Sequence, residues 1–285
     1  MGESIRSGGA RSQRVTLGLA VAAMSLALSA HATTPSYNTG SLGSAANGTN
    51  ADSVTLGPGA VGAGGDQSAV YTGAAGSNTV VPHQAALNPG MLSPFTIEFW
   101  ANPTNSDNDD APVSNRISTN PRSGWVFFQR DAATGWNFRM YDGVNGNLGW
   151  DLTGGTATLN AWSHVVATWN GSSALLYVNG ALADSSNASG ASGTYNPSSA
   201  ANLIVASSDS GSPYTGSIDE VAFYPTALSE AQIASHFNSI SSANYPSQVR
   251  SDGALLQLSN NDVPEPTGLA LLGMVAGGWA MRRRR

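Results

Sequence analysis

The sequence predicts an all-β fold, either an antiparallel sandwich or a barrel, to which one short helix is added. From Val70 onward, short apolar runs alternate with polar residues and are separated by turn dipeptides, which is the pattern of half-buried strands. Residues 162–169 and 174–180 flank Asn170-Gly171, a strong signal for a hairpin. Strands that recur at this spacing are typical of sandwiches and barrels.

The same alternation indicates the other strands. They cover residues 95–103 (FTIEFWANP), 124–131 (GWVFFQRD), 136–142 (WNFRMYD), 202–208 (NLIVASS) and 216–225 (GSIDEVAFYP). The second and third are close enough in the chain to pair, and their register decides which side chains share a face.

One helix is predicted after the last of these strands. Ser229 and Gln232 form a capping box, with Ser at the N-cap and Gln three residues later. Ile233 and Phe237 lie four residues apart, so they share one helix face. We therefore expect a helix of two or three turns that packs on the sandwich.

The composition favours a secreted β-protein and excludes several function classes. Charged residues make up 11% of the 285 residues, against roughly 25% in an average soluble protein. The chain has no cysteine, which excludes disulfides, thiolate metal sites and cysteine nucleophiles. The net charge is −6, and seven of the 12 arginines lie in the two terminal segments. Such an acidic central region is not expected to bind nucleic acid.

The N-terminus is predicted to be a secretory signal peptide over residues 1–32. Three arginines precede an apolar run at residues 15–30, and Ala30 and Ala32 then flank His31. This order of basic, apolar and A-x-A segments is typical of a signal that signal peptidase removes, here before Thr33. Residues 33–69 read as a Gly/Ser-rich leader with room for edge strands of the sandwich.

The C-terminus, residues 263–285, combines three features. Pro264, Glu265 and Pro266 form a rigid, extended motif. An uncharged run at residues 267–281 follows, which is short for a membrane span. The chain then ends in a basic stop-transfer cluster of Arg282, Arg283, Arg284 and Arg285.

This end resembles the PEP-CTERM sorting signal of Gram-negative bacteria. The resemblance implies export, transient anchoring in the inner membrane, and processing near Pro264 to Pro266 by an exosortase-type enzyme. It also implies delivery to the cell surface or to an exopolysaccharide matrix.

A second resemblance covers residues 70–240. The segments FTIEFWANPT, WSHVVATWNGSSALLYVNGALA and GSIDEVAFYPTALSEAQI are similar to laminin-G-like domains of the concanavalin A-like lectin/glucanase superfamily. The resemblance implies an antiparallel jelly-roll sandwich. Residues 241–262 are then a linker that can hold one strand.

The same resemblance bears on metal binding. Laminin-G-like relatives often carry a structural calcium ion, which makes Asp219 a candidate ligand. The alternative is that Asp219 accepts a hydrogen bond that holds a loop. Asn78 stands where the family often has an aspartate, so a cation role is not carried over to that position.

The sequence favours binding over hydrolysis. Glucanases of this fold need two carboxylates about 5–9 Å apart, and on a strand these are residues i and i+2. Glu98 has Trp100 at i+2, while Asp219 and Glu220 are adjacent and are expected to face opposite sides. His236 has no obvious partner. We therefore expect no enzymatic activity.

A sugar-binding platform is expected on the pair of strands at residues 124–131 and 136–142. If the loop between them has five residues, Trp125 and Phe127 share a face with Arg139 and Tyr141. If it has four residues, Val126, Phe128 and Arg130 join Arg139 and Tyr141 instead. The predicted ligand-binding residues are Trp125, Phe127, Arg139 and Tyr141.

The predicted function is glycan binding at the cell surface. A structural matrix protein that contacts proteins is the alternative, and a glycoside hydrolase is the third possibility.

Overall fold

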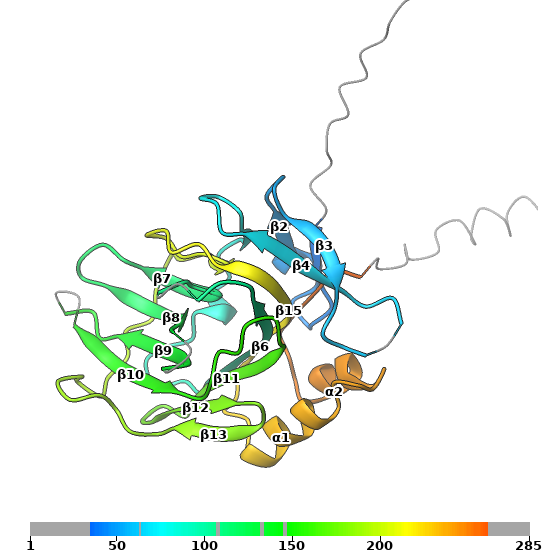
Figure 1. The fold of residues 1–285 in the computed structure, drawn as a ribbon. Coiled ribbons are helices and arrows are strands. Elements are labelled where there is room, and N and C mark those ends of the chain that lie inside the picture. Colours follow the sequence, from blue (N-terminus) through cyan, green and yellow to red (C-terminus); the bar gives the residue numbers. More distant parts are fainter. Residues whose placement is uncertain (1–34, 63, 107–108, 132–133, 145–146, 262–285) are drawn as a thin grey trace, which may run out of the picture. The chain divides into compact units, whose positions relative to one another are not determined.

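The computed structural model describes residues 35–261, except for residues 63, 107–108, 132–133 and 145–146 (Figure 1). It is an all-β antiparallel sandwich with two short helices, which confirms the predicted fold class. The strands are β1 (Pro35–Asn38), β2 (Gly48–Asn50), β3 (Thr55–Pro58), β4 (Gln67–Thr72), β5 (Thr79–Val81), β6 (Phe95–Pro103), β7 (Val113–Ile117), β8 (Ser123–Gln129), β9 (Trp136–Tyr141), β10 (Leu148–Gly154), β11 (Ser163–Trp169), β12 (Ala174–Val178), β13 (Ala181–Asp184), β14 (Leu203–Val205), β15 (Thr215–Tyr224) and β16 (Leu256–Ser259).

The strands form two layers that are joined at one edge. The first layer has the order β10-β9-β8-β7-β14-β5-β2-β1, and the second has the order β16-β15-β6-β11-β12-β13. β4 and β3 continue from β15. The layers connect where β1 pairs with β16. Every pairing is antiparallel, including the β8–β9 and β11–β12 hairpins.

The main hydrophobic core lies between the two layers. Phe99 of β6 packs edge-on against Phe127 of β8, with ring centroids 5.0 Å apart. Phe99 also meets Trp136 of β9 at 6.3 Å. Trp125, Phe127 and Phe138 are all fully buried in this core. Each such burial stabilises the fold by about 1.5–3 kcal/mol, so the register of β8 and β9 is strongly specified.

The two helices cover the outer face of the second layer (Figure 1). Helix α1 (Glu230–Asn238) begins with the predicted capping box, in which Ser229 and Gln232 each accept a hydrogen bond from the other's backbone N–H group. Ile233 is fully buried against this face, in the same cluster as Trp100. The predicted helix and its packing are thus confirmed.

Helix α2 (Tyr245–Ser251) was not expected from the sequence. Tyr245 and Val249 lie one turn apart and are both buried, and Pro246 occupies the first turn, where proline is tolerated. Two short 3₁₀ turns complete the secondary structure, η1 (Gly43–Ala46) and η2 (Ala85–Leu87).

The sandwich includes strands on both sides of residues 70–240. β1, β2 and β3 come from the Gly/Ser-rich leader, and β16 comes from the segment after α1. β16 lies between β1 and β15, with Ser259 opposite Tyr37 and Leu256 opposite Phe223. The last strand that the structure describes is therefore an internal part of the fold.

Several predicted features lie outside the described residues. These are the signal peptide with Ala30 and Ala32, the Pro264–Pro266 motif and the Arg282–Arg285 cluster. Among the described residues, no helix has the length and apolar character needed to cross a membrane.

Candidate functional site

The β8–β9 hairpin adopts the register with a four-residue loop. Val126 pairs with Arg139, and Phe128 pairs with Asn137. The loop closes where the Arg130 N–H group donates to the Gly135 carbonyl oxygen at 2.8 Å. Gly135 has a φ of 72°, and a Cβ there would overlap the backbone of Gly155. Only glycine fits both requirements, which fixes this register.

This register corrects the predicted sugar-binding platform. Trp125 and Phe127 are fully buried and face the core between the layers. They lie on the opposite face of the sheet from Arg139 and Tyr141, because side chains alternate along a strand. Phe128 takes their place beside Arg139 and Tyr141 on the outer face.

A pocket of about 340 Å³ opens on this outer face. Its floor contains the rings of Phe128 and Tyr141, which are mostly buried. Its walls carry three guanidinium groups and the carboxylate of Asp109, together with the hydroxyl groups of three serines. The guanidinium groups belong to Arg116, Arg122 and Arg139.

Arg116 is held rigidly at the base of the pocket. Its Nε lies 3.1 Å from Oδ1 of Asp209, and its Nη1 donates to the Tyr141 hydroxyl at 2.9 Å. Its Nη2 donates to Oγ of Ser208 at 3.0 Å. Arg116 comes from β7, while Asp209 and Ser208 come from the loop after β14. The loop therefore positions an arginine on the neighbouring strand.

Guanidinium groups surround the two aromatic rings of the pocket. Arg116, Arg130 and Arg139 lie 5.5, 5.2 and 5.4 Å from the centre of the Phe128 ring. Arg116 and Arg122 lie 5.9 and 5.7 Å from the centre of the Tyr141 ring. Cation–π contacts of this kind occur about once per 70–80 residues in proteins, so five around two rings is a marked concentration.

Charge is crowded in this cluster. Arg139 pairs with Asp151 at 3.1 Å, and Arg130 pairs with Asp109. Burial and the nearby positive charge of Arg139 lower the pKa of Arg130. A second pocket, of about 470 Å³, shares Asp109 with the first and is lined by Arg130, Asp131, Thr134 and Thr153. We refer to these two pockets, which share Asp109, together as the groove.

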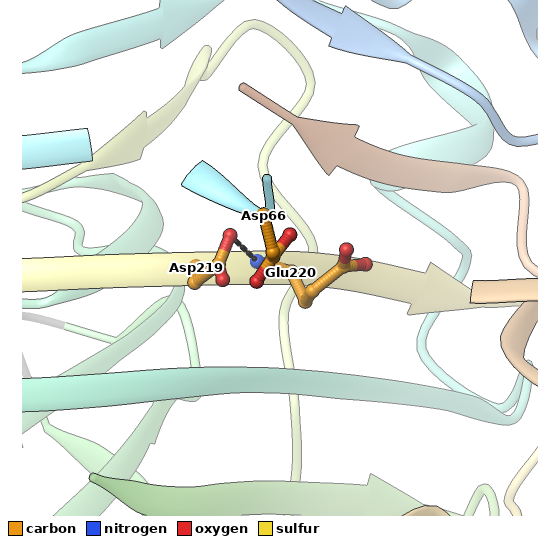
Figure 2. A group of neighbouring side chains, drawn as sticks. All are labelled: Asp66, Asp219 and Glu220. Carbon is orange, nitrogen blue, oxygen red and sulfur yellow. Dashed lines mark hydrogen bonds between the residues drawn. The ribbon is translucent and has the colours of Figure 1, made fainter. Parts of the chain in front are cut away.

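A separate group of three carboxylates lies around β15 (Figure 2). One oxygen each from Asp66, Asp219 and Glu220 lies within 4.8 Å of the others. Asp219 and Glu220 were expected to face opposite sides of the strand, and this expectation was wrong. A β-bulge shifts the register between Asp219 and Ala222, and Glu220 has a φ of 49°. The bulge breaks the alternation of side chains.

The third carboxylate comes from residues 33–69, which the sequence indicates to be a Gly/Ser-rich leader. Asp66 directly precedes β4, which pairs with β15. Its Oδ2 accepts a hydrogen bond from the Val61 N–H group at 2.8 Å, and its Oδ1 accepts from Nδ2 of Asn261 at 3.0 Å. Its place opposite the β15 bulge follows from strand pairing across about 150 residues, so sequence reasoning did not find it.

The electrostatics of the three carboxylates fit a hard cation. Burial, followed by the charges of Glu220 and Asp66, raises the pKa of Asp219 well above its usual value. Burial also raises the pKa of Glu220 to about 8. A Cβ on Gly59 would overlap the Asp66 carboxylate, so glycine leaves space at the oxygens. Grouped carboxylate oxygens are the ligands that Ca²⁺ prefers.

The same carboxylates are poorly placed for glycoside hydrolysis. Asp219 and Glu220 are each only 2% exposed. The cavity that both line measures about 10 Å³, which holds at most one water molecule. A sugar ring cannot reach them.

A buried charge network lies between the second layer and the helices. The Glu98 Oε2 atom lies 2.9 Å from Nδ1 of His236 and 3.3 Å from Nε2 of His164. The Tyr224 hydroxyl donates to the other Glu98 oxygen at 2.5 Å, and Nε2 of His236 lies 2.8 Å from Asp252. His236 thus has two carboxylate partners that the sequence did not reveal, because Glu98 is far away in the chain.

The network shifts the pKa values of its members. Burial alone would raise the pKa of Glu98, but hydrogen bonds from His164 and His236 lower it below its usual value. Burial alone would lower the pKa of His236, but the hydrogen bonds to Glu98 and Asp252 raise it. The network therefore joins α1 and the turn after α2 to β6 by charged contacts.

Comparison with two solved binding domains supports the fold. The binding domain of Paraclostridial Mosquitocidal Protein 1 aligns with a TM-score of 0.54 and 20% identity, over 72% of this chain and 52% of that one. The binding domain of botulinum neurotoxin serotype G aligns with a TM-score of 0.51 and 17% identity, over 74% and 51%. A Trypanosoma rangeli sialidase aligns with a TM-score of 0.49 and 14% identity, over 69% and 30%. The chain therefore spans about half the length of the two binding domains.

Comparison of the sequence with known proteins gives the family. No curated protein matches the chain. Residues 262–285 match the PEP-CTERM protein-sorting motif, which implies processing by an exosortase. Residues 72–234, more than half of the chain, match the model of the concanavalin A-like lectin/glucanases superfamily. The chain belongs to that superfamily.

Proposed function

We propose that this protein is an exported surface protein whose sandwich binds carbohydrate in the groove on the outer face of β8 and β9. The observation that supports this best is the open pocket of about 340 Å³, which is lined by two aromatic residues and by the guanidinium groups of three arginines. Ligand sites typically combine apolar surface with a few fixed polar groups. Arg116 is held in place by Asp209 and Tyr141, so the pocket needs little reorganisation to bind.

The two ends of the chain support export. Residues 262–285 carry the sorting motif, and the Ala30-His31-Ala32 segment fits signal peptidase. We infer that a Gram-negative host anchors the protein transiently in its inner membrane and then delivers it to the cell surface or the exopolysaccharide matrix. In that location, a surface glycan or the exopolysaccharide itself is the expected partner.

A structural calcium ion is part of this proposal. Asp66, Asp219 and Glu220 would hold it, and its charge would offset the repulsion among three crowded carboxylates. The ion would stabilise the junction of β4, β15 and the end of β16, because Asp66 also bonds Asn261. No step of ligand binding in the groove depends on it.

A glycan array tests the proposed function. The probe is the protein from Thr33 to Asp262, which contains every strand and helix that the structure describes, and the array includes the host's own exopolysaccharide. We expect binding that is lost in Arg139→Ala and weakened in Tyr141→Phe. Arg250→Ala is the matched control, because Arg250 lies on α2.

Two results would overturn the proposal. Release of reducing sugar from a bound glycan would assign the protein to the glycoside hydrolases. Absence of binding to every glycan would favour a structural matrix protein that contacts other proteins.

A further inference from the structure

We propose that the groove selects acidic glycans, and that Arg122 and Arg139 bind the carboxylate group of a sugar. This inference rests on the proposed function, because it names the class of glycan that the same groove binds. Two observations support the selectivity for acidic glycans. One is the position of the arginines, and the other is the set of guanidinium nitrogens that have no hydrogen-bond partner in the described part of the chain.

The distribution of positive charge in the chain is uneven. Five arginines and no lysine lie between the terminal segments of this acidic protein. Four of them, Arg116, Arg122, Arg130 and Arg139, surround the rings of Phe128 and Tyr141. The sandwich thus gathers nearly all of its positive charge in one groove. An arginine whose charge no carboxylate balances raises the local concentration of anionic ligands.

The carboxylates of the groove leave one arginine unpaired. Arg116, Arg130 and Arg139 each contact an aspartate, namely Asp209, Asp109 and Asp151. Asp131, at the far end of the groove, accepts hydrogen bonds from Thr134. Among the described residues, Arg122 has no carboxylate partner; its Nε donates to the Ser118 carbonyl oxygen at 3.3 Å. No carboxylate in the described part of the chain therefore pairs with its positive charge.

The free donors of the pocket match a carboxylate. Oδ1 of Asp151 accepts a hydrogen bond from Nε of Arg139. The carbonyl oxygen of Ser118 accepts one from Nε of Arg122. Within the described part of the chain, the two terminal nitrogens of each guanidinium have no hydrogen-bond partner, and both side chains line the pocket. Such a pair of terminal nitrogens binds a carboxylate in a planar, bidentate manner. By contrast, the hydroxyl, ether and amide groups of neutral sugars carry no charge for a guanidinium group to pair with.

In the described part of the chain, neighbouring side chains hold Arg122 and Arg139 in position without forming hydrogen bonds to their terminal nitrogens. The Arg139 guanidinium stacks on Phe128 and is tied to Asp151, with a side chain only 27% exposed. Arg122 lies over the Tyr141 ring, whose hydroxyl group is fixed by Arg116. The adjoining pocket of about 470 Å³ gives room for a further sugar unit, which fits a polymeric ligand.

Paired glycans test this inference. Uronate- and sialate-containing oligosaccharides are arrayed beside the same compounds after chemical reduction of their carboxyl groups, and beside sulfated oligosaccharides. The probes are wild-type protein from Thr33 to Asp262, Arg122→Gln, and Arg250→Gln as a matched control. We expect about tenfold tighter binding to the acidic member of each bound pair, since a charged hydrogen-bonded contact is lost on reduction. We also expect this preference to weaken as salt is added.

The variants and the paired glycans distinguish failure of the acidic selectivity from failure of glycan binding itself. Arg122→Gln should lose most of the acidic preference, whereas Arg250→Gln should show the wild-type preference. Equal binding to both members of every pair would overturn the acidic selectivity and leave glycan binding intact. Preference for sulfated over carboxylated glycans would overturn the assignment to a carboxylate. No binding to any glycan would overturn the proposed function itself.

Discussion

Asp219 and Glu220 are consecutive residues of β15, yet a carboxylate oxygen of each lies within 4.8 Å of the other and of Asp66. The left-handed backbone of Glu220 makes this possible. Both side chains are buried, so the protein has brought two of these three carboxylates together in a place that water does not reach, where carrying a negative charge is costly. This arrangement leads to two predictions, one on calcium and one on pH.

Calcium should raise the melting temperature of the protein. An ion that binds only the folded state stabilises it by RT ln(1 + [L]/Kd), which is about 2.7 kcal/mol at 100 times Kd. Differential scanning calorimetry with calcium and with chelator measures the shift. Asp219→Asn should remove the shift, whereas Asp52→Asn, an exposed aspartate outside the cluster, should retain it. An equal shift in Asp219→Asn would show that Asp219 is only a hydrogen-bond acceptor.

Without a divalent cation, stability should fall as pH rises from about 5 to about 8. The folded state binds a proton on Glu220 more tightly than the unfolded state, because burial raises the pKa from 4.5 to about 8. The resulting stabilisation is present below pH 4.5 and is lost as pH rises through 8.

Chemical denaturation in chelator at several pH values measures this decline. His236, whose pKa is also raised, contributes in the same direction, so Glu220→Gln isolates the Glu220 share. That variant should show a flatter profile than wild type, and calcium should flatten the wild-type profile as well. Identical profiles for the two proteins would contradict the assignment.

Glu98→Gln should destabilise the protein strongly. Removing one partner of a buried charge pair costs about 3–5 kcal/mol, and Glu98 contacts two buried histidines. Since the pKa of Glu98 is lowered, its contribution is present above its ordinary value of 4.5 and is lost as pH falls. Urea denaturation should therefore show a difference between wild type and variant that shrinks in acid. Glu230→Gln, on the exposed start of α1, is the control; a comparable loss there would argue against a special role for Glu98.

The protein isolated from its native host should begin at Thr33 and lack Arg282–Arg285. The sorting motif at residues 262–285 implies cleavage by an exosortase, and the A-x-A segment predicts cleavage by signal peptidase. N-terminal sequencing and intact mass measure both ends. Surface-displayed protein that still carries the four terminal arginines would contradict the proposed sorting route.

Local patterns allowed much of the fold to be predicted from the sequence. The Asn170-Gly171 turn joins β11 and β12, with Trp169 opposite Ala174, and the Ser229 capping box starts α1. Both depend on residues within a few positions of each other. Helix α2 carries a weaker signal, since it is short and only Tyr245 and Val249 mark its buried face.

The sites depended on information that local patterns do not carry. The register of β8 and β9 depends on whether the loop between them has four or five residues, because a one-residue slip exchanges the two faces of the sheet. The bulge at Glu220 breaks the alternation that underlay the expected side-chain directions. Asp66 and Asp219, and Glu98 and His236, come together only through the tertiary fold. In the sequence, Arg139 and Tyr141 group with either Trp125 and Phe127 or Val126 and Phe128, and the register shows that the aromatic residue on their face is Phe128.

The central claim is that carbohydrate binds on the outer face of β8 and β9. The NMR signals of the arginine side chains test this claim most directly. The protein from Thr33 to Asp262 has five arginines and no lysine, so a nitrogen-15 NMR spectrum resolves five side-chain Nε–H signals that single substitutions can assign. The oligosaccharide that binds most tightly on the array is then titrated into the labelled protein. We predict that the signals of Arg122 and Arg139 shift in a saturable manner while that of Arg250 stays in place. A shift confined to Arg250, or no shift at a concentration that saturates binding, would contradict a carbohydrate site on the outer face of β8 and β9.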